Sequence, residues 1–333
     1  MRHSSNSENV SNDVASCGKI QVMSMSLRWQ CWRIFAGTWM CVVWLAMAGM
    51  ASASEPSVEE VIPMDPRPVL RFGIPPWQKS QSVDEIREQY RPLLEWLGTQ
   101  VGYRFVVVGG RSYEDMIDLI ARGNVQFAVL SPVPYVQAKR KNPELELLLT
   151  ELKWNEAHTA TVDFYLGYII TRKDRADLTT AADLKGKRLG FVNVESTSGW
   201  RYPNAMLLAA GLDVRTGSTA LFLGSHPRVT DAIEAGSVDA GATWDFNLAE
   251  AIRKHGDVFK VIMRSPPIPN ICMVAHPSVP AELRARIRTL LPTASAELFG
   301  KTPMQGYVVR PDAFYDVVRT LIDTDVIPPQ SGP

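Results

Sequence analysis

Residues 113–130 read YEDMIDLIARGNVQFAVL, and residues 226–243 read HPRVTDAIEAGSVDAGAT. Each stretch begins with a polar ring residue, continues with helical spacing and a glycine stop, and ends in a run of strand length. Tyr113 and His226 each stand ten residues before that glycine. The repeated unit predicts two similar lobes, each directing a ring residue from a helix start into the space between them.

From Val69 onward, apolar runs of strand length alternate with helical patterns, which predicts an α/β architecture. We expect strands at residues 69–74, 103–108, 125–130, 145–149, 164–171, 188–192, 220–223, 238–243, 259–263 and 268–275. We expect helices at residues 90–101, 113–122, 202–210, 229–234 and 281–291, whereas 292–333 give too little pattern to interpret. Open α/β sheets bind ligands at strand carboxyl ends and helix starts, so the cleft between two lobes is the expected site.

The bulk composition fits a globular chain without a charged partner surface. The chain has 333 residues, of which 46% are hydrophobic and 21% charged, enough for two domains of common size. The formal net charge is zero, so nothing indicates nucleic acid or a membrane surface as a partner. An anion site in such a chain has to be built locally, from a few placed groups.

The N-terminal region has the layout of an export signal. Arg28 and Arg33 precede an apolar run at 34–50 that ends in Ala51-Ser52-Ala53, which predicts residues 1–53 as a polar leader with a cleaved signal peptide. The competing interpretation is a retained membrane anchor, since about 17 apolar residues approach the length of a span. Residues 54–68 are rich in proline and acidic residues and predict a tether.

The predicted cleavage determines which cysteines remain in the exported chain. Three of the four cysteines lie in the first 50 residues, so the exported chain would retain Cys272 alone. A single cysteine excludes an internal disulfide and a cysteine metal cluster. We expect Cys272 to be a small buried side chain.

The strongest local signal for a ligand is Glu195-Ser196-Thr197-Ser198-Gly199, between a predicted strand and a predicted helix. Three consecutive hydroxyl residues at a helix start lie beside backbone N–H groups that the helix leaves unpaired. A tetrahedral oxyanion needs many donors in a small volume, and this stretch supplies them without a formal charge. The alternative is an ordinary helix cap, for which one hydroxyl would suffice.

Two further segments carry candidate ligand groups. In Gly224-Ser225-His226-Pro227, His226 could donate to an anion, or it could cap a helix or lie on a solvated loop. In Ser131-Pro132-Val133-Pro134-Tyr135, the two prolines predict a rigid turn that presents the Tyr135 phenol. Tyr113 and Tyr135 could equally be structural. The tryptophans that could line a cleft, or simply pack, are Trp77, Trp154, Trp200 and Trp244.

Catalytic and metal-binding patterns are absent from the sequence. It contains no nucleophile elbow, zinc-protease motif, dinucleotide fingerprint or phosphate loop. The histidines after residue 54 are His158, His226, His255 and His276, and none is spaced with another as a metal pair. We therefore expect no enzyme activity, no metal and no cofactor.

Residues from about 70 to 291 resemble the phosphonate/phosphite/phosphate-binding periplasmic proteins that serve ABC importers. The segments that carry the likeness are Tyr113 with Gly123, Ser131-Pro132…Tyr135, Ser196-Thr197-Ser198-Gly199, Gly224-Ser225-His226 running to Val238-Asp239-Ala240, Asp183-Leu184-Lys185-Gly186-Lys187 and Ser265-Pro266-Pro267-Ile268-Pro269. The resemblance implies a type II periplasmic binding protein fold, with two lobes joined by a two-strand hinge. We expect one lobe over 69–168 plus 270–333, and the other over 169–269.

The resemblance also implies a set of ligand-binding residues. In this family the serine/threonine run at a helix start holds the oxyanion, and residues matching Tyr113, Tyr135 and His226 complete the grip. The full expected set is Tyr113, Ser131, Tyr135, Ser196, Thr197, Ser198, His226 and Asp239.

This sequence departs from the family members that bind aminoalkylphosphonates. Those members hold the ligand's amine with acidic residues, and the corresponding places fall near Phe246 and Ile271, which are apolar here. Asp245 is adjacent to the first place and could substitute. The departure favours a smaller anion such as phosphite, methylphosphonate or phosphate.

The expected role is that of a monomeric periplasmic receptor that closes on its ligand and docks on an ABC permease in the inner membrane. One alternative is a sensing subunit that reports the ligand to a membrane histidine kinase. A second alternative is a phosphate-ester hydrolase, with His226 near Ser198 as the nucleophile–base pair.

Overall fold

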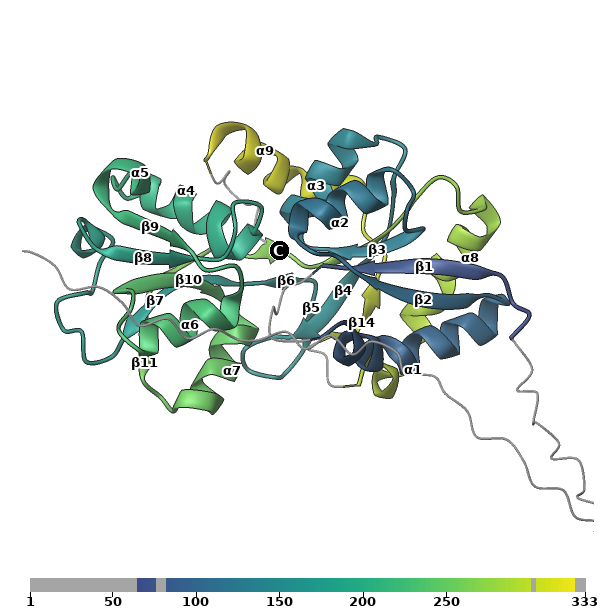
Figure 1. Cartoon of the computed structure of the whole chain (residues 1–333), viewed down its shortest axis with the longest axis horizontal. Helices are drawn as coiled ribbons and strands as arrows, with labels where there is room; N and C mark the ends of the chain where they lie inside the picture. The colour runs from purple at the N-terminus through teal and green to yellow at the C-terminus, as the bar shows by residue number, and fades with distance from the viewer. Residues whose placement is uncertain (1–64, 76–81, 301–303, 327–333) are drawn as a thin grey trace, which may run out of the picture. The chain divides into compact units, whose positions relative to one another are not determined.

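The structure is a computed structural model that describes residues 65–75, 82–300 and 304–326. Its strands form two large sheets and one short two-stranded sheet (Figure 1). The predicted signal peptide, most of the predicted tether and Trp77 lie outside the described residues.

The first sheet has the strand order β14-β4-β13-β3-β1-β2, with β5 paired to β4. Its strands are β1 (Val69–Ile74), β2 (Arg104–Gly109), β3 (Phe127–Leu130), β4 (Glu146–Trp154), β5 (Thr161–Val162), β13 (Cys272–Ala275) and β14 (Met304–Val308). β1 is parallel to β2 and β3, whereas β13 is antiparallel to both of its neighbours.

Helices cover both faces of this sheet, as the two-residue period of its strands requires. Phe127 and Val129 pack in one apolar cluster with α1 (Val83–Val101) and α8 (Ala281–Leu290). The alternate residues of β3, Ala128 and Leu130, pack in a second cluster on the opposite face. The helices of that cluster are α2 (Tyr113–Ala121), α3 (Pro132–Lys141) and α9 (Asp316–Thr324).

The second sheet repeats this plan with the order β11-β7-β10-β8-β9. Its strands are β7 (Gly167–Arg172), β8 (Arg188–Phe191), β9 (Thr219–Phe222), β10 (Ala240–Trp244) and β11 (Phe259–Arg264). Its helices are α4 (Tyr202–Ala209), α5 (Val214–Gly217), α6 (His226–Glu234) and α7 (Asp245–His255). β8 is parallel to β9 and β10, and β7 runs antiparallel to β10.

The chain passes between the two sheets twice, in paired segments. β6 (Phe164–Tyr165) and β12 (Ile268–Pro269) form a short antiparallel pair between the strands of the two sheets. After each passage the chain enters its new sheet as an antiparallel strand, β7 in one case and β13 in the other. The expected fold of two lobes joined by a two-strand hinge is therefore confirmed.

The repeated sequence unit forms the same structure twice. The first copy places α2, β3 and α3 at residues 113, 127 and 132, and the second places α6, β10 and α7 at the same intervals from residue 226. Gly123 and Gly236, just beyond the ends of α2 and α6, have φ of 74° and 70°. Positive φ in this range favours glycine, which explains why the unit needs glycine at this point.

Several expected boundaries were wrong for identifiable reasons. The two prolines after Ser131 open α3 and do not form an isolated turn, because the first helical turn leaves its N–H groups unpaired anyway. Helix α1 begins at Val83, seven residues before the expected start, with a capping box between Ser82 and Glu85. Helices α7 and α9 and strand β14 are not among the elements expected from the sequence.

Among the described residues, no helix is both long and apolar enough to cross a membrane. Cys272 is fully buried in β13, as expected for a small core side chain.

Glu151 gives the fold a testable pH dependence. Its side chain on β4 is buried, and burial raises the pKa of the carboxyl from 4.5 to about 8. Between these values the folded chain binds the proton that the unfolded chain has released, so the free energy of unfolding should fall as pH rises from 4.5 to about 8. We expect Glu151→Gln to remove this loss, which is at most about 1.4 kcal/mol per pH unit.

Urea unfolding of wild type and Glu151→Gln at about pH 5 and about pH 8 measures the difference. The matched control is Glu144→Gln, at an exposed residue in the loop before β4. If the midpoints of Glu151→Gln and wild type decrease equally over this range, Glu151 does not titrate as described.

Candidate functional site

A small pocket collects most of the predicted ligand residues. Its volume is about 30 Å³, and a single water molecule requires roughly 10–15 Å³. Its space therefore suits a ligand of only a few atoms. The lining residues are Tyr113, Ser131, Tyr165, Ser196, Thr197, Ser198, His226, Trp244 and Ile271.

The two copies of the repeated unit contribute matching positions to this pocket. Tyr113 is the first residue of α2, and His226 is the first residue of α6. Ser131 precedes α3 at its cap position, and Trp244 holds the same position before α7. The pocket thus lies where two strand ends and four helix starts meet, the place at which open α/β sheets bind ligands.

The sequence that follows Ser131 explains why its hydroxyl does not cap helix α3. Pro132 and Pro134 have no N–H, and the N–H of Val133 donates to the Thr197 hydroxyl at 3.0 Å. Helix α3 therefore needs no cap from Ser131, and its side chain makes no capping bond. Its buried Oγ has no hydrogen-bond partner among the described residues, which is costly unless a ligand supplies one.

The serine/threonine run forms a single π-helical turn, Thr197–Arg201. Ser196 caps it by accepting from the Gly199 N–H at 3.1 Å, so the capping interpretation holds for this hydroxyl. The backbone N–H groups of Thr197 and Ser198 find no acceptor in the described part of the chain. The turn therefore lines the pocket with Thr197 and Ser198, whose hydroxyls hydrogen-bond Tyr165 and whose backbone N–H groups are left over.

The ring residues of the pocket are uncharged at neutral pH. Burial raises the pKa of Tyr113 to about 12, against the opposite effect of a hydrogen bond with Ser196. Burial likewise raises the pKa of Tyr165, so both phenols keep their protons and can donate. Burial lowers the pKa of His226 to about 3, which leaves the ring neutral. No lysine, arginine, aspartate or glutamate is among the lining residues.

Tyr135, predicted as a ligand residue, does not line this pocket. It lies in the first turn of α3 and is fully buried, with its hydroxyl bonded to Asp312. Its ring meets Tyr315 edge-on, with 4.9 Å between the centroids. Because Tyr135 lies in a helix and not in the predicted turn, its side chain packs against the C-terminal part of the chain.

Asp239 also lies away from the pocket. It precedes β10, whereas the pocket residue Trp244 ends that five-residue strand, and five residues at ~3.3 Å span about 16 Å. Its carboxylate accepts from the Arg188 backbone at 2.9 Å and from the Arg175 guanidinium at 2.9 Å. The bonds to Arg188 hold the pKa of this carboxyl well below its usual range.

Three lining residues were not among the predicted ligand residues. The sequence indicates Trp244 only as one of four tryptophans that could line a cleft, and Ile271 only as an apolar residue near a place where related proteins have an acid. Tyr165, in the passage between the sheets, had no signal in the sequence beyond its strand pattern. Of the other tryptophans, Trp200 packs edge-on against Phe191, at 4.8 Å between centroids.

Asp245 is not free to hold an amine, because it forms a buried ion pair. The Lys153 ammonium of β4 bonds to this carboxylate at the start of α7, and the side chains are only 10% and 12% exposed. The same carboxylate accepts from the backbone N–H of Leu166 at 3.1 Å and of Phe246 at 2.8 Å. The pair links the first sheet to the helix that follows Trp244.

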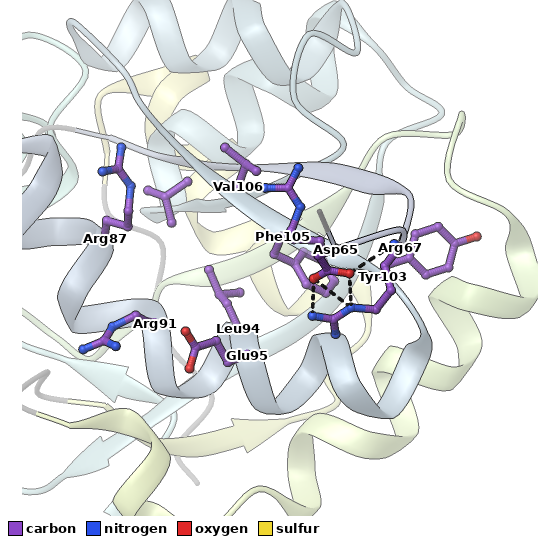
Figure 2. A pocket seen from close by; sticks show the side chains of 11 residues that line it. Asp65, Arg67, Arg87, Arg91, Leu94, Glu95, Tyr103, Phe105 and Val106 are labelled. Carbon is purple, nitrogen blue, oxygen red and sulfur yellow. Dashed lines mark hydrogen bonds and ion pairs between the residues drawn. The ribbon is translucent and has the colours of Figure 1, made fainter. Parts of the chain in front are cut away.

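A second cavity is richer in arginine but lacks the features of a built anion site. Figure 2 shows this cavity, about 390 Å³, beside α1 and β2. Arg67 is bonded to Asp65, and Arg87 and Arg91 pair with acidic residues near them in sequence. These guanidinium groups are substantially exposed, and exposed pairs are weak because water screens them. The smaller pocket remains the candidate site.

Within the described residues, no group of histidine, cysteine, aspartate and glutamate side chains is arranged to hold a metal ion.

Comparison with known proteins gives one family match that covers most of the chain. Residues 72–309 match the family described as "ABC transporter, phosphonate, periplasmic substrate-binding protein". The chain is 26% identical over 262 residues to the phosphate-import protein PhnD of Mycolicibacterium smegmatis, covering 75% of this chain and 78% of that protein. A shorter match, 27% identical over 126 residues, is to the tetrathionate sensor histidine kinase TtrS of Salmonella typhimurium, covering 38% of this chain and 21% of the kinase.

Solved structures show the same fold. One is a binding protein component of an ABC phosphonate transporter from Pseudomonas aeruginosa, with TM-score 0.65, 18% identity, and coverage of 77% of this chain and 86% of that one. Another is PhnD1 of Prochlorococcus marinus in complex with methylphosphonate, with TM-score 0.64, 16% identity, and coverage of 76% and 96%.

The buried ion pair predicts a large, local effect on stability. Lys153→Met should lower the free energy of unfolding by about 3–5 kcal/mol, because Asp245 stays buried without its cation. The control is Arg264→Gln, which removes an exposed pair with Glu156 and should cost less than about 1 kcal/mol. Urea unfolding of both variants measures these losses. Equal losses of unfolding free energy would show that the Lys153–Asp245 pair contributes no more than a surface pair.

Proposed function

The chain belongs to the family of periplasmic substrate-binding proteins of ABC phosphonate transporters; from this we propose that it binds a small phosphorus oxyanion in the pocket lined by Ser131, Ser196–Ser198 and His226. The ligands that suit the pocket are phosphite, methylphosphonate and phosphate. The single observation that carries the proposal is the buried Ser131 hydroxyl, which has no partner among the described residues and lies at a pocket with further donors.

The donors match what an oxyanion requires. The Ser131 hydroxyl and the backbone N–H groups of Thr197 and Ser198 have no partner in the described part of the chain, and Tyr113, Tyr165 and His226 add ring donors. Fixed dipoles in a buried site interact more strongly than in water, so an anion can be held without a formal positive charge. A cation would find no carboxylate among the lining residues.

Size and polarity favour an anion with little or no substituent. Trp244 and Ile271 present apolar surface to the pocket, and Asp245 is occupied by Lys153. An aminoalkyl group would bury its ammonium without a partner, at a cost of several kcal/mol. A methyl group or a hydrogen on phosphorus has no such requirement.

The transport role is supported by the extent of the family match. The family match covers residues 72–309, which include both sheets except part of β1. The match to the sensor kinase covers only 38% of this chain. We therefore propose an exported monomer that closes on its ligand and docks on an inner-membrane ABC permease. A sensing role is the less supported candidate.

A hydrolase role has little support from the pocket. A serine nucleophile requires a hydrogen bond to its base, and no bond joins Ser198 to His226 among the described residues. His226 Nδ1 instead lies 3.4 Å from the Thr243 hydroxyl. We propose a binding protein without catalytic activity.

A thermal-shift panel tests the ligand class. The chain from residue 54 is heated with phosphite, phosphate, methylphosphonate, 2-aminoethylphosphonate and sulfate in turn. We expect stabilisation by a small phosphorus anion, about 2.7 kcal/mol at 100 times the dissociation constant, and none by 2-aminoethylphosphonate. A panel without any shift, or one led by 2-aminoethylphosphonate, would contradict the proposed ligand.

Ser131→Ala tests the residue that carries the proposal. Since this hydroxyl makes no bond with any described residue, its removal should leave stability unchanged and weaken oxyanion binding by about tenfold, or about 1.4 kcal/mol. The matched control, Ser82→Ala, removes the cap of α1 and should cost about 1 kcal/mol of stability with no change in affinity. Calorimetric titration and urea unfolding of both variants distinguish the roles. Unchanged affinity in Ser131→Ala would place this hydroxyl outside the ligand site.

A further inference from the structure

We propose that His226 holds the bound anion as a neutral imidazole, donating from Nε2–H, and that Thr243 and Asn247 fix this tautomer from outside the pocket. The inference rests on the proposed function, because it concerns the same site. It adds two positioning residues and makes the protein's side of the site uncharged with and without ligand.

A chain of hydrogen bonds leads from α7 to the ring of His226. The Asn247 amide nitrogen donates to the Thr243 hydroxyl oxygen at 2.9 Å, and that oxygen lies 3.4 Å from His226 Nδ1. All three side chains are buried. Neither Thr243 nor Asn247 lines the pocket, whereas His226 does.

The direction of these bonds decides the tautomer. An amide N–H₂ group can only donate, so the Thr243 oxygen accepts from Asn247 and retains its own hydrogen. Within the described residues that hydrogen has one acceptor, His226 Nδ1. A neutral ring that accepts at Nδ1 carries its proton on Nε2. Nε2 has no partner in the described part of the chain, so its N–H is free for the pocket.

The three residues of this chain of hydrogen bonds lie on three different elements. His226 opens α6, Thr243 is the second-last residue of strand β10, and Asn247 follows four residues later in α7. α6 packs on β10 and on α7. The second copy of the repeated unit therefore places Thr243 beside the ring of His226, and this residue orients the ring.

The charges around His226 do not favour an imidazolium. On β10 there is no charged residue, and on α7 the acid nearest the pocket, Asp245, is paired with Lys153. The start of α6 carries the positive end of its helix dipole, which disfavours a second positive charge there. Burial lowers the pKa of His226, in agreement with this geometry.

Apart from Arg228, which is exposed in the first turn of α6 two residues after His226, the remaining titratable groups on the packed elements are paired or lie at far ends. On α6 itself, Asp231 is bonded to Lys254 and His255 of α7. Arg188, which begins β8, is bonded to Asp239, and Arg172, which ends β7, is bonded to Asp174. The other charged residues of α6 and α7 are Arg228, Glu234, Glu250 and Arg253. The titratable groups that share the pocket are the phenols of Tyr113 and Tyr165.

The consequence is a binding equilibrium that takes up no proton on the protein. Its pH dependence should follow the ionisation of the ligand alone between about pH 5 and about pH 8. A site that used an imidazolium would instead bind more weakly as the pH rises through that range.

Nitrogen NMR of the histidine rings tests the tautomer directly. The chain from residue 54, labelled with ¹⁵N in its histidines, is measured alone and with phosphite or methylphosphonate at about pH 5 and about pH 8. The His226 signals are assigned by their loss in His226→Gln. We expect the Nε2–H tautomer in every condition. An imidazolium in the complex, or the Nδ1–H tautomer, overturns the proposal.

Variants separate positioning from folding. Thr243→Val should mix the two tautomers and weaken binding of the same anion by about tenfold. Thr243→Ser should restore the single Nε2–H tautomer and the affinity. The control is Thr171→Val, a fully buried threonine of β7 whose hydroxyl donates to the Asp239 carbonyl at 2.6 Å, and it should change neither. A wild-type ring spectrum in Thr243→Val overturns the role of Thr243.

His226→Gln and His226→Leu test the absence of charge. Glutamine can donate without a charge and should keep most of the affinity, whereas leucine should lose about tenfold or more. Equal losses in both variants contradict a neutral donor. If the wild type binds none of the anions, the proposed function fails, while the ligand-free spectrum still decides whether Thr243 and Asn247 set the tautomer.

Discussion

The passage of the chain between its two sheets is the constraint on which the rest of the structure depends. Because β6 and β12 pair side by side, the chain enters each sheet as an antiparallel strand next to the parallel strands. The helices that follow those parallel strands then start at the same level as the passage. Tyr165 in β6 and Ile271 just after β12 consequently line the same pocket as the helix starts.

The pocket is built from neutral donors, and the structure shows why they are free. A buried polar group normally finds a partner within the protein, and most of those described here do. At α3 two prolines and the Val133–Thr197 bond remove the need for a cap, so the Ser131 hydroxyl stays unpaired within the part of the chain that the structure describes. The same bond fixes the serine/threonine turn against α3. In the proposed complex, an oxyanion that accepts from these donors would recover the cost of leaving them unpaired.

The fold class and the repeated unit could be predicted because they depend on local periodicity. Strand and helix patterns at β3, β10, α2 and α6 are visible over a few residues, and the glycines mark turns that need positive φ. Helices α7 and α9 were not predicted because their stability depends on packing. The first residue of α7, Asp245, forms an ion pair with Lys153, and α9 packs on α3. The α3 prolines were ambiguous, since proline suits both a turn and a helix start.

The sequence by itself determined the α/β architecture and the two-lobed organisation. Of the eight ligand residues expected from it, six line the candidate pocket: Tyr113, Ser131, Ser196, Thr197, Ser198 and His226. Tertiary structure alone decided which neighbours face that pocket. It directed Tyr135 toward Asp312, left Asp239 with its arginines at the opposite end of β10, and brought in Tyr165, Trp244 and Ile271. The physical reason is that periodicity assigns a residue to an element and a face, whereas the partners of a side chain depend on contacts between segments far apart in sequence.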